Sequence, residues 1–316
     1  MTGERAVLIA ARGLLVLLHP RLVRHFAKRL GYAPDPACPR TYNEKLLWRK
    51  LIDRDRRFVA LSDKLASKDY ARARCPDLAI PRTLWAGEDP GAIPEAVLSG
   101  DVVVKTSHGF DFNIFIANGQ YDRARLVRTL RTWLRTSHGK TELEWAYIPI
   151  VPRVFVEEQL PLADGDAPTD IKVHACDGEV VHGWAVNKKT NRAVTIDRSG
   201  APIAPAADYA SDEQALPVGA ALRERFAEAG GFARRLSEGI DYARYDFLVA
   251  HGRPYFSEIT VYPAAGYDRW TDPAIADKLT RSWDLRRSAF LMADHRGLAG
   301  LYARALRSHL DRVDPR

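Results

Sequence analysis

The stretch RYDFLVAHGRPYFSEIT, residues 244–260, decides the fold prediction because it has the pattern of two strands joined by a tight turn. Each strand carries one carboxylate within an apolar and aromatic sequence, Asp246 in YDFLV and Glu258 in YFSEI. With the turn at residues 251–253, these acids fall nearly opposite each other and point to the same face. Directly opposed Cβ atoms lie about 4.5–5.5 Å apart, so the two charges repel unless a cation lies between them.

The paired acids have two interpretations. Mg²⁺ is usually held by one or two carboxylates together with substrate phosphates, so the pair could bind this ion. Alternatively, the hairpin lies at a sheet edge, where its acids face water or pair with Arg244 and Arg253. The hairpin alone leaves both interpretations open.

The composition indicates a globular protein with one large core or two modest cores. The chain has 316 residues, 46% hydrophobic and 28% charged, and its 47 Lys and Arg against 40 Asp and Glu give a formal charge of +7. A basic surface attracts phosphates, acidic polymers or anionic lipid. Three scattered cysteines without a CxxC pair argue against a disulfide framework and a zinc site, and they fit a reducing cytoplasm.

The first 30 residues are basic and partly apolar. The apolar segment 6–18 contains Arg12 and is too short to span a bilayer. Residues 1–30 could lie on an anionic membrane as an amphipathic helix, or they could pack on the domain. We therefore expect a cytoplasmic protein with peripheral contact at the inner face of the membrane as one option.

Periodicity and turn signals predict an α+β protein rather than a regular βαβ sheet. Thr41 and Glu44 have the spacing of a capping box at a helix start. The expected helices cover residues 4–31, 41–52, 62–75, 121–137, 221–237 and 284–310. The expected strands cover residues 79–86, 101–107, 153–160, 170–178 and 179–187, followed by the opening hairpin.

Two further stretches could contact a nucleotide. In DVVVKTSHGFDFN (101–113), Lys105 ends an apolar strand before a loop with Ser107, His108 and Gly109, which suits phosphate binding although it is not a Walker A motif. In RVFVEEQLP (153–161), an apolar strand turns polar at Glu157 and Glu158, as at an adenine-binding strand end. These residues taken alone favour an ordinary edge strand.

Taken in order, these pieces resemble ATP-grasp enzymes of the TupA-like (teichuronopeptide-biosynthesis) branch. The stretches that carry the resemblance are PRTYNEKLLWRKLIDRD, LSDKLASKDY, VVVKTSHG, EWAYIPIVPRVFVEEQL, DIKVHACDGEVV and ARYDFLVAHGRPYFSEITVYPAAGYDRW. The resemblance implies an ATP-grasp fold in which two α+β subdomains grip ATP, with an N-terminal helical region. The corresponding parts are a basic N-terminal helical segment (1–40), a helical lead-in (41–75), subdomain 1 with the phosphate loop (76–156) and subdomain 2 with the metal site and a C-terminal helix (157–316).

The resemblance also implies roles for individual residues. Lys64 and Lys105 match the phosphate-binding lysines, and Arg244 matches the residue facing the transferred phosphoryl group, so Arg244 and Lys105 are the expected catalytic residues. Asp246, Glu258 and Thr260 match the magnesium ligands. The remaining ATP contacts are the loop residues Ser107, His108, Gly109 and Asn113, the hinge residues Glu157, Glu158, Gln159 and Leu160, and the pair Asp170 and Lys172.

The sequence departs from the family pattern in three places. Thr260 stands where asparagine is usual, alanines (Ala264 and Ala265) replace Gly or Ser, and the phosphate loop carries bulky residues at 110–112. Bulky side chains restrict the approach of backbone to phosphate, so activity could be weakened or retuned. We still expect a working enzyme because the lysines and both carboxylates are present.

The implied activity is an ATP- and Mg²⁺-dependent carboxylate–amine ligase that acts through an acyl phosphate in cell-surface polysaccharide or peptide-like polymer biosynthesis. Its substrates would be small-molecule or glycan-linked carboxylates and amines. Lys188, Lys189, Arg192 and Arg269 could hold an acidic substrate or could be solvated surface. The alternatives are an ATP-grasp-type kinase with a hydroxyl acceptor and a non-catalytic basic binding module. We expect no nucleic-acid partner, because no RNP-like or helix-turn-helix pattern is visible.

Overall fold

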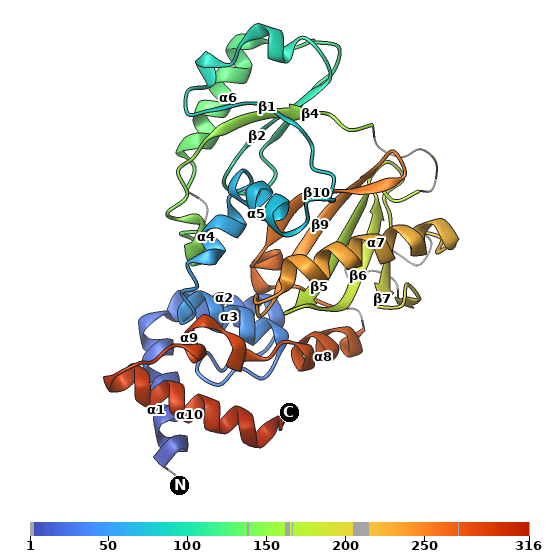
Figure 1. Ribbon diagram of the computed structural model, residues 1–316. Coiled ribbons are helices and arrows are strands. Elements are labelled where there is room, and N and C mark those ends of the chain that lie inside the picture. The colour runs from blue at the N-terminus through green and yellow to red at the C-terminus, as the bar shows by residue number, and fades with distance from the viewer. Residues whose placement is uncertain are drawn as a thin grey trace.

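The computed structural model of the chain describes residues 3–137, 139–161, 165, 167–204, 215–270 and 272–315. Two antiparallel sheets occupy the upper and right-hand parts of the molecule, and helices lie against and below them (Figure 1). Sheets built from hairpins with separate helices confirm the α+β prediction.

The smaller sheet has the strand order β1–β4–β2–β3. Its strands are β1 (Thr83–Gly87), β2 (Val102–Thr106), β3 (Asn113–Ile116) and β4 (Val154–Glu158). Helix α6 (Arg123–Arg135) covers this sheet at the top of Figure 1, where Leu126 and Leu130 share a buried cluster with Val104. The predicted division between subdomains at residues 156 and 157 falls within β4, and it stays a prediction.

The larger sheet has the strand order β10–β9–β5–β6–β7–β8 among the described residues. Its strands are β5 (Asp170–Cys176), β6 (Glu179–Asn187), β7 (Arg192–Asp197), β8 (Pro202–Ala204), β9 (Ala243–Ala250) and β10 (Arg253–Thr260). Helix α7 (Ala220–Ser237) packs on one face, where Ile171 and Val173 join the main core. Because side chains alternate along a strand, Lys172 faces the opposite side, which is the side of the candidate site.

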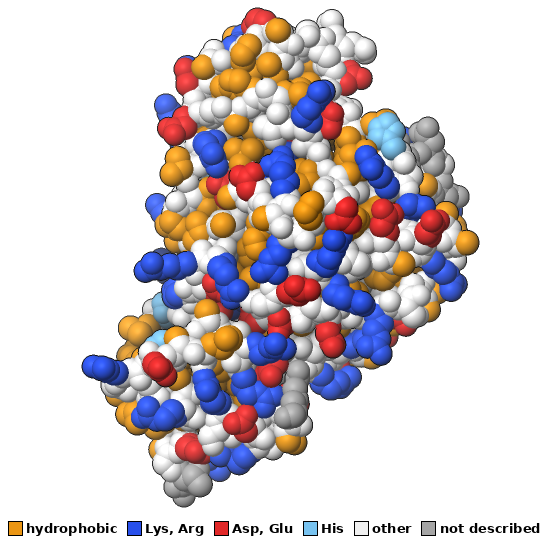
Figure 2. Space-filling view, in the orientation of Figure 1, with side chains coloured by type: hydrophobic (Ala, Val, Ile, Leu, Met, Phe, Trp, Pro, Cys, Tyr) orange, Lys and Arg blue, Asp and Glu red, His pale blue; other side chains and the backbone are white. Residues whose placement is uncertain are grey.

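Most other helices gather below the sheets in Figure 1, where both termini also lie. They are α1 (Gly3–Leu18), α2 (Pro20–Leu30), α3 (Tyr42–Leu51), α8 (Pro273–Ser282), α9 (Ala289–Met292) and α10 (Gly297–Val313), while α4 (Arg57–Ser62) and α5 (Ala66–Arg74) lie between the two sheets. Phe26, Trp48, Trp283 and Tyr302 belong to the core of this helical end. Lys and Arg side chains, interspersed with acids, are spread over the whole face drawn in Figure 2.

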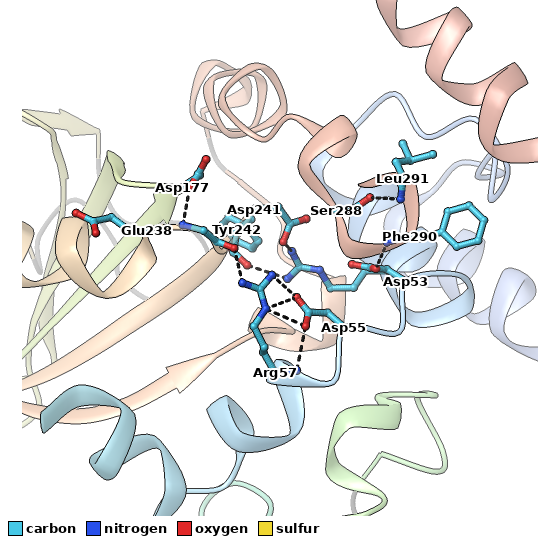
Figure 3. Close-up of polar contacts among 12 residues, drawn as sticks. Asp53, Asp55, Arg57, Asp177, Glu238, Asp241, Tyr242, Ser288, Phe290 and Leu291 are labelled. Atoms are coloured by element: carbon cyan, nitrogen blue, oxygen red, sulfur yellow. Dashed lines mark hydrogen bonds and ion pairs between the residues drawn. The ribbon is translucent and has the colours of Figure 1, made fainter. Parts of the chain in front are cut away.

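A buried polar network fixes the end of α3 to the larger sheet and to α9 (Figure 3). Arg49 Nη2 forms an ion pair with Asp241 Oδ1 at 2.8 Å, just before β9. Asp53 Oδ1 accepts a hydrogen bond of 3.0 Å from the Phe290 backbone N–H. Burial and nearby Asp241 raise the pKa of Asp53 to about 7. The helical lead-in is therefore held to the subdomain that carries the paired acids.

The helix predictions need three corrections. The helix expected over 4–31 breaks at His19, because Pro20 starts a new helix and has no N–H to continue the first one. The helix expected from Ser62 starts at Ala66, after Asp63 Oδ1 accepts from the Leu65 N–H at 2.8 Å. The helix expected over 284–310 is broken between α9 and α10. The capping box of Thr41 and Glu44 is present as expected.

In the described part of the chain, no single helix has both the length and the apolar composition needed to cross a membrane. Helices α1 and α2 together have the required length and apolar composition, but the chain bends by 95° between them.

Candidate active site

The hairpin of β9 and β10 places the two acids opposite each other by means of a bulge. Near the turn, Arg253 pairs with Ala250, but the register shifts after Phe256, so that Glu258 pairs with Asp246. Ser257 is the extra residue at this shift. The opposition of the acids expected from the sequence is present, and it depends on this one inserted residue.

Asp246 is buried and neutralised by two cations. It pairs in register with Lys172 of β5, whose Nζ donates to Asp246 Oδ2 at 2.7 Å. The Arg244 guanidinium donates to both carboxylate oxygens, each at 2.7 Å. Burial alone would raise the pKa of Asp246, but Arg244 and Lys172 outweigh it and hold this pKa below its ordinary value. Asp246 is therefore a carboxylate at all physiological pH values.

Lys64 joins the second acid to the phosphate loop. It lies between α4 and α5, and its Nζ is 2.9 Å from Glu258 Oε2 and donates to the Gly109 carbonyl at 2.7 Å. Its backbone N–H donates to the Ser107 carbonyl at 2.8 Å. Burial opposes ionisation of Glu258, but the Lys64 ammonium prevails and the pKa of Glu258 is lowered. One lysine thus contacts the loop and strand β10 at the same time.

A second buried cluster surrounds Glu157 on β4. Lys105 of β2 contacts Glu157 Oε1, and Lys68 Nζ of α5 donates to Oε2 at 2.7 Å. Burial disfavours the charge, yet the two ammonium groups lower the pKa of Glu157. Sequence reasoning missed Lys68. Its spacing of four residues from Lys64 gives no signal, because Lys64 precedes helix α5 and contacts a different acid.

The phosphate loop is anchored at both ends. Ser107 Oγ accepts from the Arg153 N–H at 3.0 Å, and His108 Nε2 lies 3.1 Å from the Thr136 carbonyl oxygen. Phe112 stacks on Trp133 of α6 with ring centroids 4.8 Å apart. Asn113 lies on β3 opposite Lys105 rather than in the loop. Phe112, one of the bulky loop residues, therefore ties the loop to α6.

A cavity of about 810 Å³ adjoins these groups. Of the predicted residues, those that line it are Lys64, Gly109, Lys172, Arg192, Arg244, Glu258 and Thr260. The lining also includes His25 and Arg29 from α2, and Glu142 and Glu144 from the segment before β4. No local pattern marks these four residues, because only the path of the chain brings them to the site.

The structure describes all the other predicted site residues, and none of them lines this cavity. Glu158 Oε1 accepts from the Arg82 N–H at 2.8 Å, and the Gln159 N–H donates to the Asp101 carbonyl at 3.3 Å, with Leu160 following. The Glu158 N–H also donates to the Arg82 carbonyl at 3.1 Å, so the backbone donors of Glu158 and Gln159 in the predicted adenine hinge already have partners.

The predicted acidic-substrate residues separate in the structure. Lys188 Nζ donates to Asp170 Oδ1 at 2.6 Å, and Arg269 Nε donates to the Arg29 carbonyl at 2.8 Å. Lys189 lies in the turn between β6 and β7. Of this predicted group, Arg192 is the member that lines the cavity.

Two antiparallel sheets beside a cavity lined by lysines and by the strand-borne Glu258 give the arrangement that the resemblance implies for an ATP-grasp fold. More narrowly, the chain belongs to the TupA-like ATP-grasp family, whose model matches residues 44–281. This confirms both the resemblance and the fold predicted from it. No curated protein matches the chain in sequence.

Solved structures similar to this chain include two D-alanine–D-alanine ligases. The enzyme from Bacillus anthracis is 18% identical over 80% of this chain and 68% of its own, with a TM-score of 0.38. The enzyme from Helicobacter pylori is 15% identical over 74% of this chain and 64% of its own, with a TM-score of 0.46. The ATP-grasp ligase PsnB, complexed with a minimal precursor, is 16% identical over 80% of this chain and 61% of its own, with a TM-score of 0.38.

Proposed function

We propose that the protein is an ATP-dependent carboxylate–amine ligase that forms an amide through an acyl phosphate. The observation that carries this proposal is the row Glu258–Asp246–Lys172 across three neighbouring strands, with Arg244 and Lys64 bound to its acids. Glu258 and Lys172 of this row line a cavity large enough for a phosphate tail and a small substrate, and Asp246 lies buried between them. Membership of the ATP-grasp family supports ATP as the phosphoryl donor.

The site's oxygen donors fit magnesium. Asp246 and Glu258 are adjacent carboxylates, and the Thr260 hydroxyl lies 3.3 Å from Arg244 Nη2 beside them. Among the described residues, no group of three or more His, Cys, Asp or Glu side chains is placed to hold a metal, so phosphate oxygens would complete the ligand set. Magnesium bound there would neutralise charge on the transferred phosphoryl group.

The chain's own residues would supply the rest of the chemistry. Lys64 and the Gly109 backbone lie where a phosphate would meet the loop, and Arg244 and Lys172 would offset negative charge that develops during transfer. The anchored loop would limit the access of water to a hydrolysable acyl phosphate. Phosphoryl transfer needs no side-chain nucleophile, which fits the absence of such a motif in the sequence.

The biological setting forms part of the same proposal. The substrates would be a small-molecule or glycan-linked carboxylate and an amine, used in assembling a cell-surface polysaccharide or peptide-like polymer at the cytoplasmic face of the membrane. Helix α1 packs inward through Leu8 and Leu15 and exposes Leu17 and Leu18 outward. With the basic residues of α2, this arrangement suits peripheral contact with anionic lipid.

The proposal is tested by measuring release of ADP and phosphate across panels of amino acids and sugar acids, with hydroxylamine as a trap for acyl phosphate. We expect hydroxamate from at least one carboxylate, and a loss of at least about 10²-fold in Asp246→Asn and Lys64→Met. A thermal melt of each variant separates lost chemistry from lost folding. A phosphorylated hydroxyl product would point to a kinase instead, and full activity in Asp246→Asn would overturn the site.

A further inference from the structure

The cavity lining carries both positive and negative side chains. Lys64, Lys172 and Arg244 supply cations beside the paired acids, and Glu142 and Glu144 add two carboxylates to the same lining. A ligase that joins a carboxylate to an amine has to hold an anionic acyl phosphate and a cationic ammonium group together. The two kinds of lining match those two charges.

Glu142 is held in place by two other elements. Its Oε2 accepts a hydrogen bond of 2.8 Å from the Tyr267 hydroxyl, and its Oε1 lies 3.7 Å from His25 Nε2 on α2. Helix α2 lies outside residues 44–281, which the family model matches, so the His25 contact comes from a segment that the family model does not cover.

Glu144 has a different environment. No described residue forms a hydrogen bond or ion pair with its carboxylate, although it lines the cavity. Burial raises the pKa of Glu144 to about 7, while the Lys50 ammonium opposes this rise and Glu142 adds to it. Tyr147, Tyr262 and Tyr267 are the other ionisable groups that interact with it.

Glu144 shares the cavity with the phosphoryl-transfer groups. Tyr147 and Tyr262 line this cavity together with Glu144, Glu258 and Arg244. Tyr262, which lines the cavity at 2% exposure, has a hydroxyl without a hydrogen-bond partner of standard geometry among the described residues. A buried hydroxyl in this state can accept a further partner, which a bound ligand atom or a water would supply.

We propose that Glu144 is the catalytic base that binds the amine substrate as its ammonium ion and accepts one proton from it, with Glu142 as a second anionic contact. This inference rests on the proposed ligase function. The freed nitrogen lone pair attacks the acyl carbon, the C–N bond forms, and the C–O bond to phosphate breaks. Phosphate leaves with that electron pair and takes the second amine proton, which balances the reaction. A near-neutral carboxylate can both take and release a proton at physiological pH.

The test compares two nucleophiles with the same carboxylate, which is the one that gives most hydroxamate in the wild type. Hydroxylamine is largely unprotonated at neutral pH and needs no base, whereas ammonium and glycine are protonated. We expect Glu144→Gln to slow amide formation from ammonium or glycine about 10²-fold more than hydroxamate formation. This difference should shrink as the pH rises and free amine accumulates. Glu88→Gln, an exposed change of the same kind, serves as the matched control.

A second readout does not need turnover. With ¹³C-labelled glutamate carboxyls, a signal that titrates near pH 7 in the wild type should be missing from Glu144→Gln. Equal slowing of both nucleophiles, or of neither, would overturn the role of Glu144 while leaving the ligase intact. Failure of the wild type to form hydroxamate or amide from any carboxylate would instead overturn the ligase proposal, and this inference with it.

Discussion

Replacement of Lys68 by Met should destabilise the protein by breaking a buried ion pair. The side chains of Lys68 and Glu157 are each 4% exposed and lie 2.7 Å apart, so removal of one ammonium leaves a buried carboxylate with a single partner. Loss of one member of such a pair costs about 3–5 kcal/mol. Lys105 still contacts Glu157 in this variant, so we expect a destabilisation at the low end of this range, about 3 kcal/mol.

This loss corresponds to a measurable fall in melting temperature. An unfolding entropy of about 2.1 cal/mol/K per residue makes 3 kcal/mol equal to a shift of roughly 5 °C for a 316-residue chain. Urea unfolding measures the free energy of unfolding, and calorimetry measures the melting temperature. Arg72→Met on the same helix is the control, because Arg72 is 52% exposed and pairs with an exposed Asp69, and its loss should change stability by at most about 0.5 kcal/mol.

The pH dependence provides an independent check. Because its pKa is lowered on folding, Glu157 contributes stability above its unfolded pKa and loses it as the pH falls through the folded value. The gap between wild type and Lys68→Met should therefore narrow below about pH 4. If Lys68→Met is as stable as Arg72→Met at pH 7, the ion pair contributes nothing and the reasoning is wrong.

Three further changes test other features. The wild type should lose up to about 4 kcal/mol of unfolding free energy as the pH rises from 4 through the raised Asp53 pKa of about 7. Asp53→Asn should not show this loss, and identical pH profiles of the two proteins in urea unfolding would contradict the prediction. Gly183→Ala should cost about 2 kcal/mol or more, because its Cβ would lie 2.5 Å from a ring carbon of Phe226; an unchanged calorimetric melt would refute it. Changing Leu17 and Leu18, 76% and 60% exposed, to Ser should leave the melt unchanged but weaken binding to anionic liposomes; retained binding would exclude α1 as the contact.

The opening hairpin and its acids could be predicted because the information is local. Alternation along two short strands sets which side chains share a face, and a turn of two residues, His251 and Gly252, sets the approximate register. The bulge at Ser257 could not be predicted, because the expected turn over residues 251–253 already places Asp246 opposite Glu258. The structure has a turn of two residues and reaches the same pairing through the bulge. Without the bulge Glu258 would pair with Tyr245, and the two acids would point to opposite faces.

The acidic lining and the Lys68 contact depend on distant parts of the chain. Glu142 and Glu144 precede β4 by about ten residues, yet their neighbours His25, Lys50 and Tyr267 come from α2, α3 and the segment after β10. Sequence spacing carries no information about such meetings. Of the residues predicted to hold an acidic substrate, Arg192 lines the cavity, and the prediction did not include the carboxylates that share this lining.

The salt bridges of Asp246 and Glu258 have a consequence for the order of ligand binding. Lys172, Arg244 and Lys64 already serve as counter-ions. In the proposed ligase, a divalent metal that binds without nucleotide would therefore have to compete with them for the same oxygens. A triphosphate offers those cations another anion and frees the carboxylates. The affinities for metal and nucleotide should thus be thermodynamically linked, each ligand strengthening the other by an equal factor.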